Sequence, residues 1–212
     1  IGKACAADTF WAQNDSFNKA LAIQKDNKYV IISGIPGIGK PTLSRILILY
    51  LLSNGFEEFV YLNQSIDDGY EFFTNGKKQV FFFDDFLGKN FFEKKHTPNE
   101  DNRIVKFIEK IKRSPDKVLI LATREYILNQ AKNAYEAFRI KNIDIAKCVL
   151  DLSSYTNLIK AQIIYNHWYF ADVPVEHLED LVAELQNDWL KRKKYSQLIS
   201  HPNYNPRIIE TI

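Results

Sequence analysis

The stretch "SGIPGIGKPTLSR", residues 33–45, joins a short apolar run to a longer segment with helix-like composition. From Gly34 to Lys40 it has the spacing G-x-x-x-x-G-K, with a further glycine at position 37. A glycine-rich loop between a strand and a helix lets backbone N–H groups turn toward phosphate oxygens, and the helix N-terminus adds positive potential. The sequence therefore predicts a phosphate-binding loop. Its expected nucleotide contacts are Gly34, Ile35, Pro36, Gly37, Ile38, Gly39, Lys40, Pro41 and Thr42.

Pro41 departs from this pattern, because a serine or threonine hydroxyl is expected there as a Mg²⁺ ligand. Proline removes that hydroxyl and also the backbone N–H, and it disfavours helical geometry at the preceding Lys40. Thr42 cannot replace the hydroxyl, because one residue along a helix turns the side chain by about 100°. A proline near a helix start costs little stability, so we expect damage to the site and not to the fold. A natural loss, a deliberate change and a cloning error are all compatible with a proline here.

Apolar runs alternate with helix-like segments through the first three quarters of the chain. The runs show little polar alternation, which is typical of parallel strands buried on both faces. Their ranges are 29–33, 59–63, 79–83, 117–123 and 148–152. The helix-like segments between them are 42–54, 66–73, 102–113 and 125–133. The sequence predicts an α/β fold, a parallel sheet with helices on both faces.

The pattern changes after residue 152, where no strand signal remains. Three helices are expected, at 157–170, 175–192 and 195–200. We therefore predict two domains, a core over residues 1–153 and a small all-helical subdomain over residues 154–212.

Polar residues follow two of the expected strands. Asp84 and Asp85 end the run "QVFFFDD", and Thr123 and Arg124 end "LILATR". Ligands of open α/β sheets bind at the carboxyl ends of the strands. Asp84 is therefore a candidate to hold Mg²⁺, Asp85 to polarise the attacking water, and Arg124 to contact a γ-phosphate beside Lys40.

Composition bears on the binding partners and the cellular compartment of the protein. The net charge of +2 comes from 28 basic and 26 acidic residues, which argues neither for nor against binding to nucleic acid. Cys5 and Cys148 are expected to be free thiols, as in a reducing cytosol. The longest apolar run, 46–52, is far too short to span a bilayer, so we expect a cytoplasmic protein without membrane contact. The chain lacks methionine altogether, which we interpret as a piece of a longer protein.

The order "SGIPGIGKPTLSR", "FFFDDFLG", "ILATREY" and "HPNYNPRIIE" resembles the novel STAND P-loop NTPases of the third class, in bacteria. The resemblance implies a sheet order of 5-1-4-3-2, a helical lid, ATP and Mg²⁺ as cofactors, and a switch driven by ATP hydrolysis. It also implies that Pro206 packs near the nucleotide base. It further implies sensor and effector regions on the same chain, contact with nucleic acid only through such regions, and a role in antiviral defence.

Two other functions compete with a STAND switch. An AAA-type ATPase that remodels DNA or protein predicts ATP-dependent assembly into a ring. A degenerate, non-catalytic P-loop module is favoured by Pro41 and disfavoured by the intact Lys40, Asp84, Asp85 and Arg124. Phe10 or Trp11, which precede the first strand, could stack on an adenine ring, although plain packing is the simpler interpretation.

Overall fold

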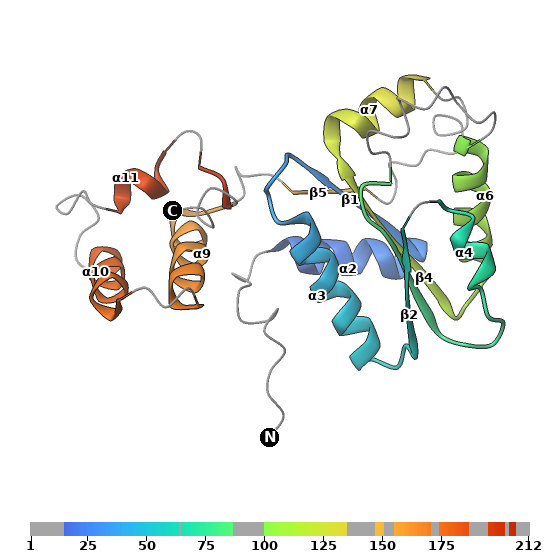
Figure 1. The fold of residues 1–212 in the computed structure, drawn as a ribbon, viewed down its shortest axis with the longest axis horizontal. Helices are drawn as coiled ribbons and strands as arrows, with labels where there is room; N and C mark the ends of the chain where they lie inside the picture. Colours follow the sequence, from blue (N-terminus) through green and yellow to red (C-terminus); the bar gives the residue numbers. More distant parts are fainter. Residues whose placement is uncertain are drawn as a thin grey trace. The chain divides into compact units, whose positions relative to one another are not determined.

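The computed structural model describes residues 15–63, 65–86, 100–134, 147–150, 155–170, 174–186, 195–201 and 204–206. The chain divides into two compact units. The sheet unit comprises Asp15–Pro36 and Lys40–Leu150, and the helical unit comprises Ile1–Asn14, Gly37–Gly39 and Asp151–Ile212 (Figure 1). The tip of the predicted phosphate loop therefore groups with the helical unit. The predicted division at residue 153 falls in a stretch outside the described residues and stays a prediction.

Five parallel strands form the sheet, in the order β2-β3-β4-β1-β5. Their bounds are β1 Tyr29–Gly34, β2 Glu58–Leu62, β3 Gln79–Phe83, β4 Lys117–Arg124 and β5 Lys147–Leu150. This order, read from the other edge, is 5-1-4-3-2, so the predicted α/β fold and its strand order are confirmed.

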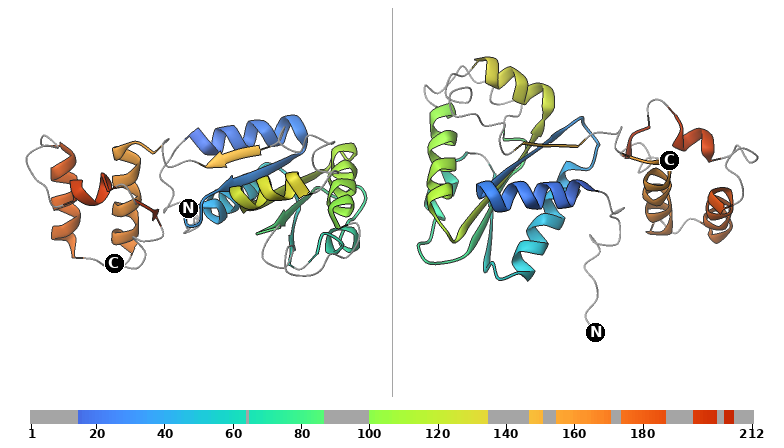
Figure 2. Two further views of the ribbon diagram at one scale, coloured as in Figure 1. Left: turned by 90° about the horizontal axis from the view of Figure 1, so that it is seen from above. Right: turned by 180° about the vertical axis from the view of Figure 1, so that it is seen from behind.

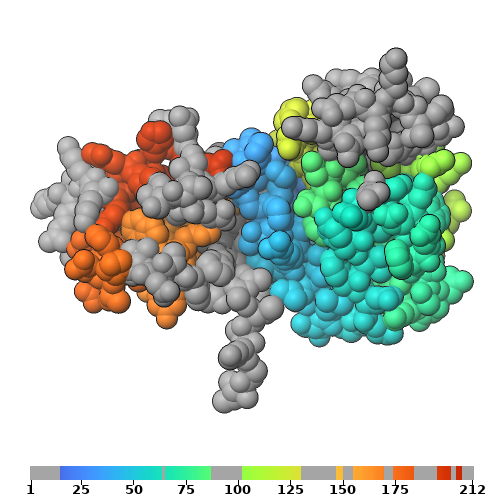
Figure 3. Space-filling model, in the orientation of Figure 1, coloured from blue at the N-terminus to red at the C-terminus, as the bar shows by residue number. Residues whose placement is uncertain are grey.

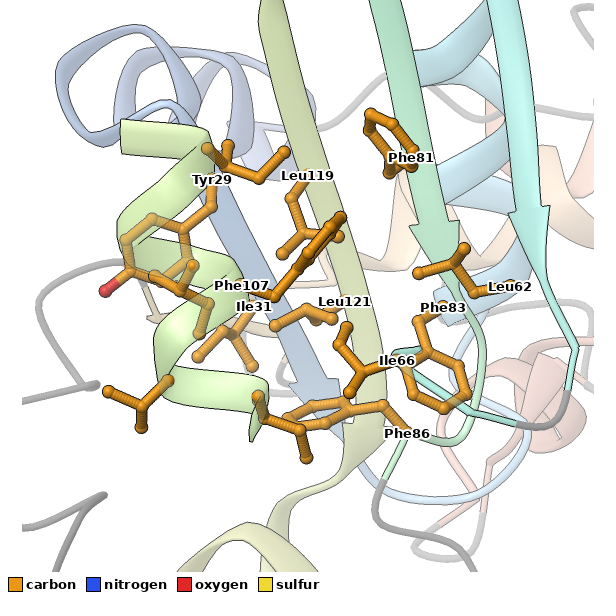
Figure 4. Close-up of a cluster of buried hydrophobic side chains, with 14 of the residues drawn as sticks. Tyr29, Ile31, Leu62, Ile66, Phe81, Phe83, Phe86, Phe107, Leu119 and Leu121 are labelled. Atoms are coloured by element: carbon orange, nitrogen blue, oxygen red, sulfur yellow. The ribbon is translucent and has the colours of Figure 1, made fainter. Parts of the chain in front are cut away.

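The three inner strands are buried on both faces, as the sequence predicts, because a continuous apolar run fills the middle of each one. On one face, the side chains of Ile31, Phe81 and Leu121 pack with Phe107 in a continuous core (Figure 4). The prediction of two buried faces is wrong for β2, which alternates between exposed and buried residues. As an edge strand, β2 leaves Phe59 and Tyr61 about half exposed, and the cyan segments around it reach the surface in Figure 3.

Helices cover both faces of the sheet (Figures 1 and 2). The helices α6 (Glu100–Arg113) and α7 (Glu125–Ala134) contribute to the core of Figure 4, and α6 does so through apolar residues at helical spacing. The helix α3 (Lys40–Ser53) contacts β1 to β4 with a separate set of buried residues, and α2 (Asp15–Asn27) packs beside it. The sequence analysis did not predict α2.

The helix α4 spans only Asp68–Glu71, so the predicted helix over 66–73 is too long. The reason is the buried side chain of Gln79 at the start of β3. Its Nε2 donates to the carbonyl of Phe72 at 2.8 Å, and its Oε1 accepts from the N–H of Thr74 at 2.9 Å. These bonds take over the backbone groups that a longer helix would need.

The helical unit contains α9 (Asn157–Phe170), α10 (Val175–Gln186) and α11 (Ser196–Ile199). The predicted bounds of the first are correct, and residues 187–192 of the second lie outside the described residues. Trp168 packs edge-to-face on Tyr195, with ring centroids 5.2 Å apart, and His177 Nδ1 lies 3.2 Å from Tyr195 Oη. These contacts join the three helices.

Cys148 is a free, buried thiol on β5, as predicted, and burial raises its pKa to about 11. Cys5 lies outside the described residues. Among the helices that the structure describes, none is both long and apolar enough to cross a bilayer.

Candidate nucleotide site

The sheet topology places the predicted site residues at one edge. The neighbouring strands β3, β4 and β1 all run in the same direction, so their carboxyl ends meet. Gly34 is the last residue of β1 and is paired in register with Arg124, the last residue of β4. Asp84 follows β3 directly. This edge is where open α/β sheets bind their ligands.

The glycine loop follows β1 and requires glycine for its backbone. Gly37 and Gly39 have φ angles of 79° and 98°, in the left-handed region that side chains rarely adopt. A Cβ atom on Gly39 would meet no atom within 4 Å, so its backbone angle and not the available space demands glycine. Ile35 is exposed, whereas Ile38 is fully buried.

Lys40 turns its ammonium group back into this loop. Its Nζ donates to the carbonyls of Gly34 at 3.0 Å and Ile35 at 2.8 Å. Burial lowers the pKa of Lys40, and the charge of Arg124 adds to that effect, while Asp85 and Asp84 oppose it. The charges of both carboxylates and of the arginine thus act on the pKa of the loop lysine.

Pro41 is accommodated without disturbing the helix. The helix α3 begins at Lys40, and Pro41 is exposed in its first turn. The first N–H groups of a helix have no intrahelical acceptor, so the missing N–H of proline costs no helical bond there. The expectation that Pro41 pushes Lys40 out of helical geometry is therefore wrong. The losses of a hydroxyl and of a backbone N–H remain.

The two aspartates differ in their surroundings. Asp84 is half-buried, and its Oδ1 accepts the N–H of Asp85 at 3.0 Å. Burial raises the pKa of Asp84, and the neighbouring Asp85 adds to this, while that hydrogen bond, Lys40 and Arg45 act against it. Asp85 is exposed and has a φ of 47°, a left-handed conformation that aspartate tolerates better than most residues. The chain therefore turns sharply where it leaves β3.

Arg124 donates from Nη1 to Tyr126 Oη at 3.1 Å. That bond, followed by the charge of Asp85, raises the pKa of Arg124. Beside it, Thr123 is paired in register with Ser33, and both hydroxyl groups are buried without a hydrogen-bond partner among the described residues. Ser33 was not predicted from the sequence, although its place just before the glycine loop was the available signal.

The donor set fits Mg²⁺ only in part. Mg²⁺ is commonly held by one or two carboxylates, with water and substrate phosphate as the other ligands. Asp84 and Asp85 supply such carboxylates, and Pro41 supplies no hydroxyl. Over the described ranges, no group of three or more His, Cys, Asp or Glu side chains could hold a metal by itself. An ion here would depend on the phosphates of a bound nucleotide.

Other predicted contacts lie elsewhere. Pro206 is half-buried in the helical unit, and its contact with a nucleotide base stays a prediction. Phe10 and Trp11 lie outside the described residues.

A parallel sheet of this order, with a glycine loop between β1 and α3 and acidic residues after β3, defines a P-loop NTPase. The family model described as Novel STAND NTPase 3 matches residues 11–170. The chain belongs to this family of nucleotide-binding proteins.

Solved structures are only distantly similar. ORC2 from Aeropyrum pernix, in ADPNP–ADP complexes, is 12% identical with a TM-score of 0.47, over 73% of this chain and 51% of that one. PCH-2 from C. elegans is 11% identical with a TM-score of 0.46, over 92% of this chain and 55% of that one. The chain thus spans about half the length of these two structures. The search of curated proteins gives no match.

Proposed function

We propose that this chain is the ATP-binding switch domain of a STAND protein, with slow Mg²⁺-dependent hydrolysis that Pro41 weakens further. One observation carries the proposal. Lys40 bonds back to Gly34, which is paired in register with Arg124, and Asp84 and Asp85 follow the end of the parallel strand β3. A surface loop without function has no reason to gather two carboxylates and an arginine around a buried lysine.

Each charged group has a defined task in this proposal. Lys40 exchanges its bonds to the carbonyls of Gly34 and Ile35 for bonds to the β- and γ-phosphate oxygens. Arg124 offers a second cation to the γ-phosphate, held in place by Tyr126. Arg124 is thus held before the ligand arrives, whereas Lys40 must first give up its two carbonyl bonds.

The two carboxylates have separate roles, one toward the attacking water and one toward the metal ion. Asp85 is exposed and accepts a hydrogen bond from the attacking water, which it orients toward the γ-phosphorus. Asp84 is the residue whose carboxylate would hold a Mg²⁺ ion beside the phosphates. When bound there, Mg²⁺ neutralises phosphate charge and orients the γ-phosphate for in-line attack.

Pro41 is expected to reduce both affinity and turnover. The hydroxyl that would ligate Mg²⁺ is missing, as is one N–H that would face the phosphates. The fold is intact around it, since α3 runs unbroken from Lys40. The defect is therefore chemical and local, and one substitution should reverse it.

The wider role follows from the family resemblance. ATP binding would favour one arrangement of the switch, and loss of the γ-phosphate another. In the cytoplasm of a bacterium, sensor and effector regions on the same longer chain would use this change in antiviral defence. ATP-dependent homo-oligomerisation is part of the same proposal, and nucleic acid would be contacted only by those other regions.

A degenerate, non-catalytic module is the second candidate. Pro41 favours it, as do the bonds of Lys40, which satisfy two of its three N–H donors without any ligand. Nucleotide binding separates the two candidates, because only the switch requires it.

The first test compares two lysine variants by calorimetry with ATP. Lys40→Met should abolish binding, because the buried ammonium group is the main cation of the loop. Lys106→Met, an exposed position on α6, is the matched control and should bind like the parent. Equal binding by parent and Lys40→Met would refute the proposed site.

A further inference from the structure

We infer that Tyr155 is a positioning residue that holds the Ile38–Gly39 peptide group of the phosphate loop in its nucleotide-binding orientation. The inference rests on the proposed function and adds to it a contact within the helical unit, to which both Tyr155 and Ile38 belong.

The contact itself is short and buried. Tyr155 Oη donates to the carbonyl oxygen of Ile38 at 3.1 Å. Tyr155 is 6% exposed and Ile38 is 1% exposed, so water has little access to compete for this bond. Both residues belong to the helical unit, although Ile38 lies only two positions before Lys40.

Peptide geometry converts this bond into an orientation of the neighbouring amide. The chain has no cis peptide bond among its described residues, so the carbonyl of Ile38 and the N–H of Gly39 point in opposite directions. Fixing the carbonyl on the Tyr155 side therefore fixes the Gly39 N–H on the opposite side. That N–H is one of the loop donors that a phosphate oxygen would accept from.

The Tyr155 hydrogen bond is needed because the backbone of the loop can adopt more than one conformation at this point. Gly37 and Gly39 flank Ile38, and both have positive φ. Rotation of the Ile38–Gly39 peptide plane changes the ψ angle of Ile38 and the φ angle of Gly39, and glycine accepts either sign of φ. Nothing covalent in the loop therefore prevents the Gly39 N–H from turning away. Pro41 has no N–H to donate, which makes the remaining donors of the loop more important.

Tyr155 is itself tied to α9. The neighbouring Thr156 Oγ1 accepts the N–H of Ile159 at 3.2 Å, as an N-cap does. On the same helix, the carbonyl of Lys160 accepts from Tyr204 Oη at 3.0 Å, and the Lys160 ammonium lies 5.1 Å from the Tyr204 ring centroid. A change in the Ile38 peptide group is thus transmitted to the start of α9 through one hydroxyl.

The test removes that hydroxyl alone. Tyr155→Phe keeps the ring, and Tyr195→Phe is the matched control, since Tyr195 is also a buried tyrosine of the helical unit whose hydroxyl contacts His177. Both variants are made in the parent and in Pro41→Thr. ATP affinity is measured by calorimetry, and ¹⁵N relaxation dispersion of the Gly39 amide is measured without nucleotide.

We expect Tyr155→Phe to bind ATP about three- to tenfold more weakly, which is the usual effect of one hydrogen bond. Its Gly39 amide should show exchange on the microsecond to millisecond scale. Tyr195→Phe should give the same ATP affinity and the same Gly39 dispersion as the protein into which it is introduced, the parent or Pro41→Thr. The inference would be overturned if both variants changed ATP affinity equally, or if the Gly39 amide of Tyr155→Phe showed no relaxation dispersion.

Failure of the proposed function gives a different result. If neither the parent nor Pro41→Thr binds ATP, the switch is refuted. The dispersion measurement then still decides whether Tyr155 holds the peptide group.

Discussion

At the scale of single residues, Pro41 and Asp84 show how a site can be altered while the fold is kept. Pro41 occupies the first turn of α3, where helices have N–H groups to spare. Asp84 is ionisable and half-buried, which opposes its charge. Neither Pro41 nor the charge of Asp84 is explained by the stability of the fold, and both residues lie where the nucleotide phosphates are proposed to bind.

Asp84→Asn should have opposite effects on stability and on metal-dependent binding. Burial raises the pKa of Asp84, so its folded-state pKa lies above the unfolded one and its contribution to stability is lost as pH rises through that window. At pH 7 the ionised carboxylate therefore costs stability, and the asparagine variant should unfold at the same or a higher temperature. Asparagine Oδ1 can still accept the N–H of Asp85.

The same variant, in the Pro41→Thr background, should lose the Mg²⁺-dependent part of ATP binding. With Asp84 present, that part should decline as pH falls, beginning at a higher pH than for an ordinary aspartate. Calorimetry with Mg²⁺ and with EDTA across pH 4.5–8, together with thermal unfolding, gives both readouts. A Mg²⁺ dependence that survives Asp84→Asn would remove Asp84 from the metal site.

The sequence could predict these residues because the P-loop pattern has fixed spacing and strand ends are recognisable. It could not predict that the Lys40 ammonium binds Gly34 and Ile35, or that Tyr155 reaches Ile38. The latter bond joins positions 117 residues apart, and no local pattern encodes such a contact.

At the scale of elements, propensity succeeded where packing agreed with it. The strand β3 was predicted to the residue because its four apolar residues are bounded by the polar Gln79 and Asp84, which mark its ends. The edge strand β2 was read as fully buried because aromatic and β-branched residues look alike in buried and edge strands. The helix α4 was predicted too long because its end depends on the side chain of Gln79, which follows it by eight residues.

Packing at α4 makes Gly69 sensitive to substitution. A Cβ atom at Gly69 would lie 2.5 Å from Phe107 Cζ, and Phe107 is fully buried in contact with Phe81. The ring cannot yield easily, so Gly69→Ala should destabilise the protein by about 1–3 kcal/mol, as overpacking generally does. Urea unfolding at equilibrium measures this change.

A second substitution separates overpacking from a general effect of alanine in α4. Phe107→Leu shortens the side chain that Gly69→Ala would meet. The double variant should lose less unfolding free energy than the two single variants lose together, because the shorter side chain at position 107 relieves the clash with the alanine. Strict additivity would show that the clash is not the cause.

At the scale of the whole molecule, the chain combines a parallel sheet unit with a helical unit that includes the tip of the phosphate loop. The sheet order followed from the family resemblance, since alternating strands and helices predict a parallel sheet without specifying its order. The change from α/β to all-helical composition predicts a separate helical subdomain over residues 154–212, and that boundary stays a prediction. The membership of Gly37–Gly39 in that unit could not be predicted, because it depends on contacts between distant segments.

The central claim is that this is a nucleotide switch site in which Pro41 is the one defective part. Calorimetric titration of ATP, with Mg²⁺ and with EDTA, into the chain and into Pro41→Thr tests it most directly. We predict that Pro41→Thr binds MgATP about ten- to hundredfold more tightly than the chain does, because a metal ligand and a backbone donor return together. EDTA should abolish most of that gain. Identical affinities with and without Mg²⁺ in both proteins, or no binding by either, would contradict the account.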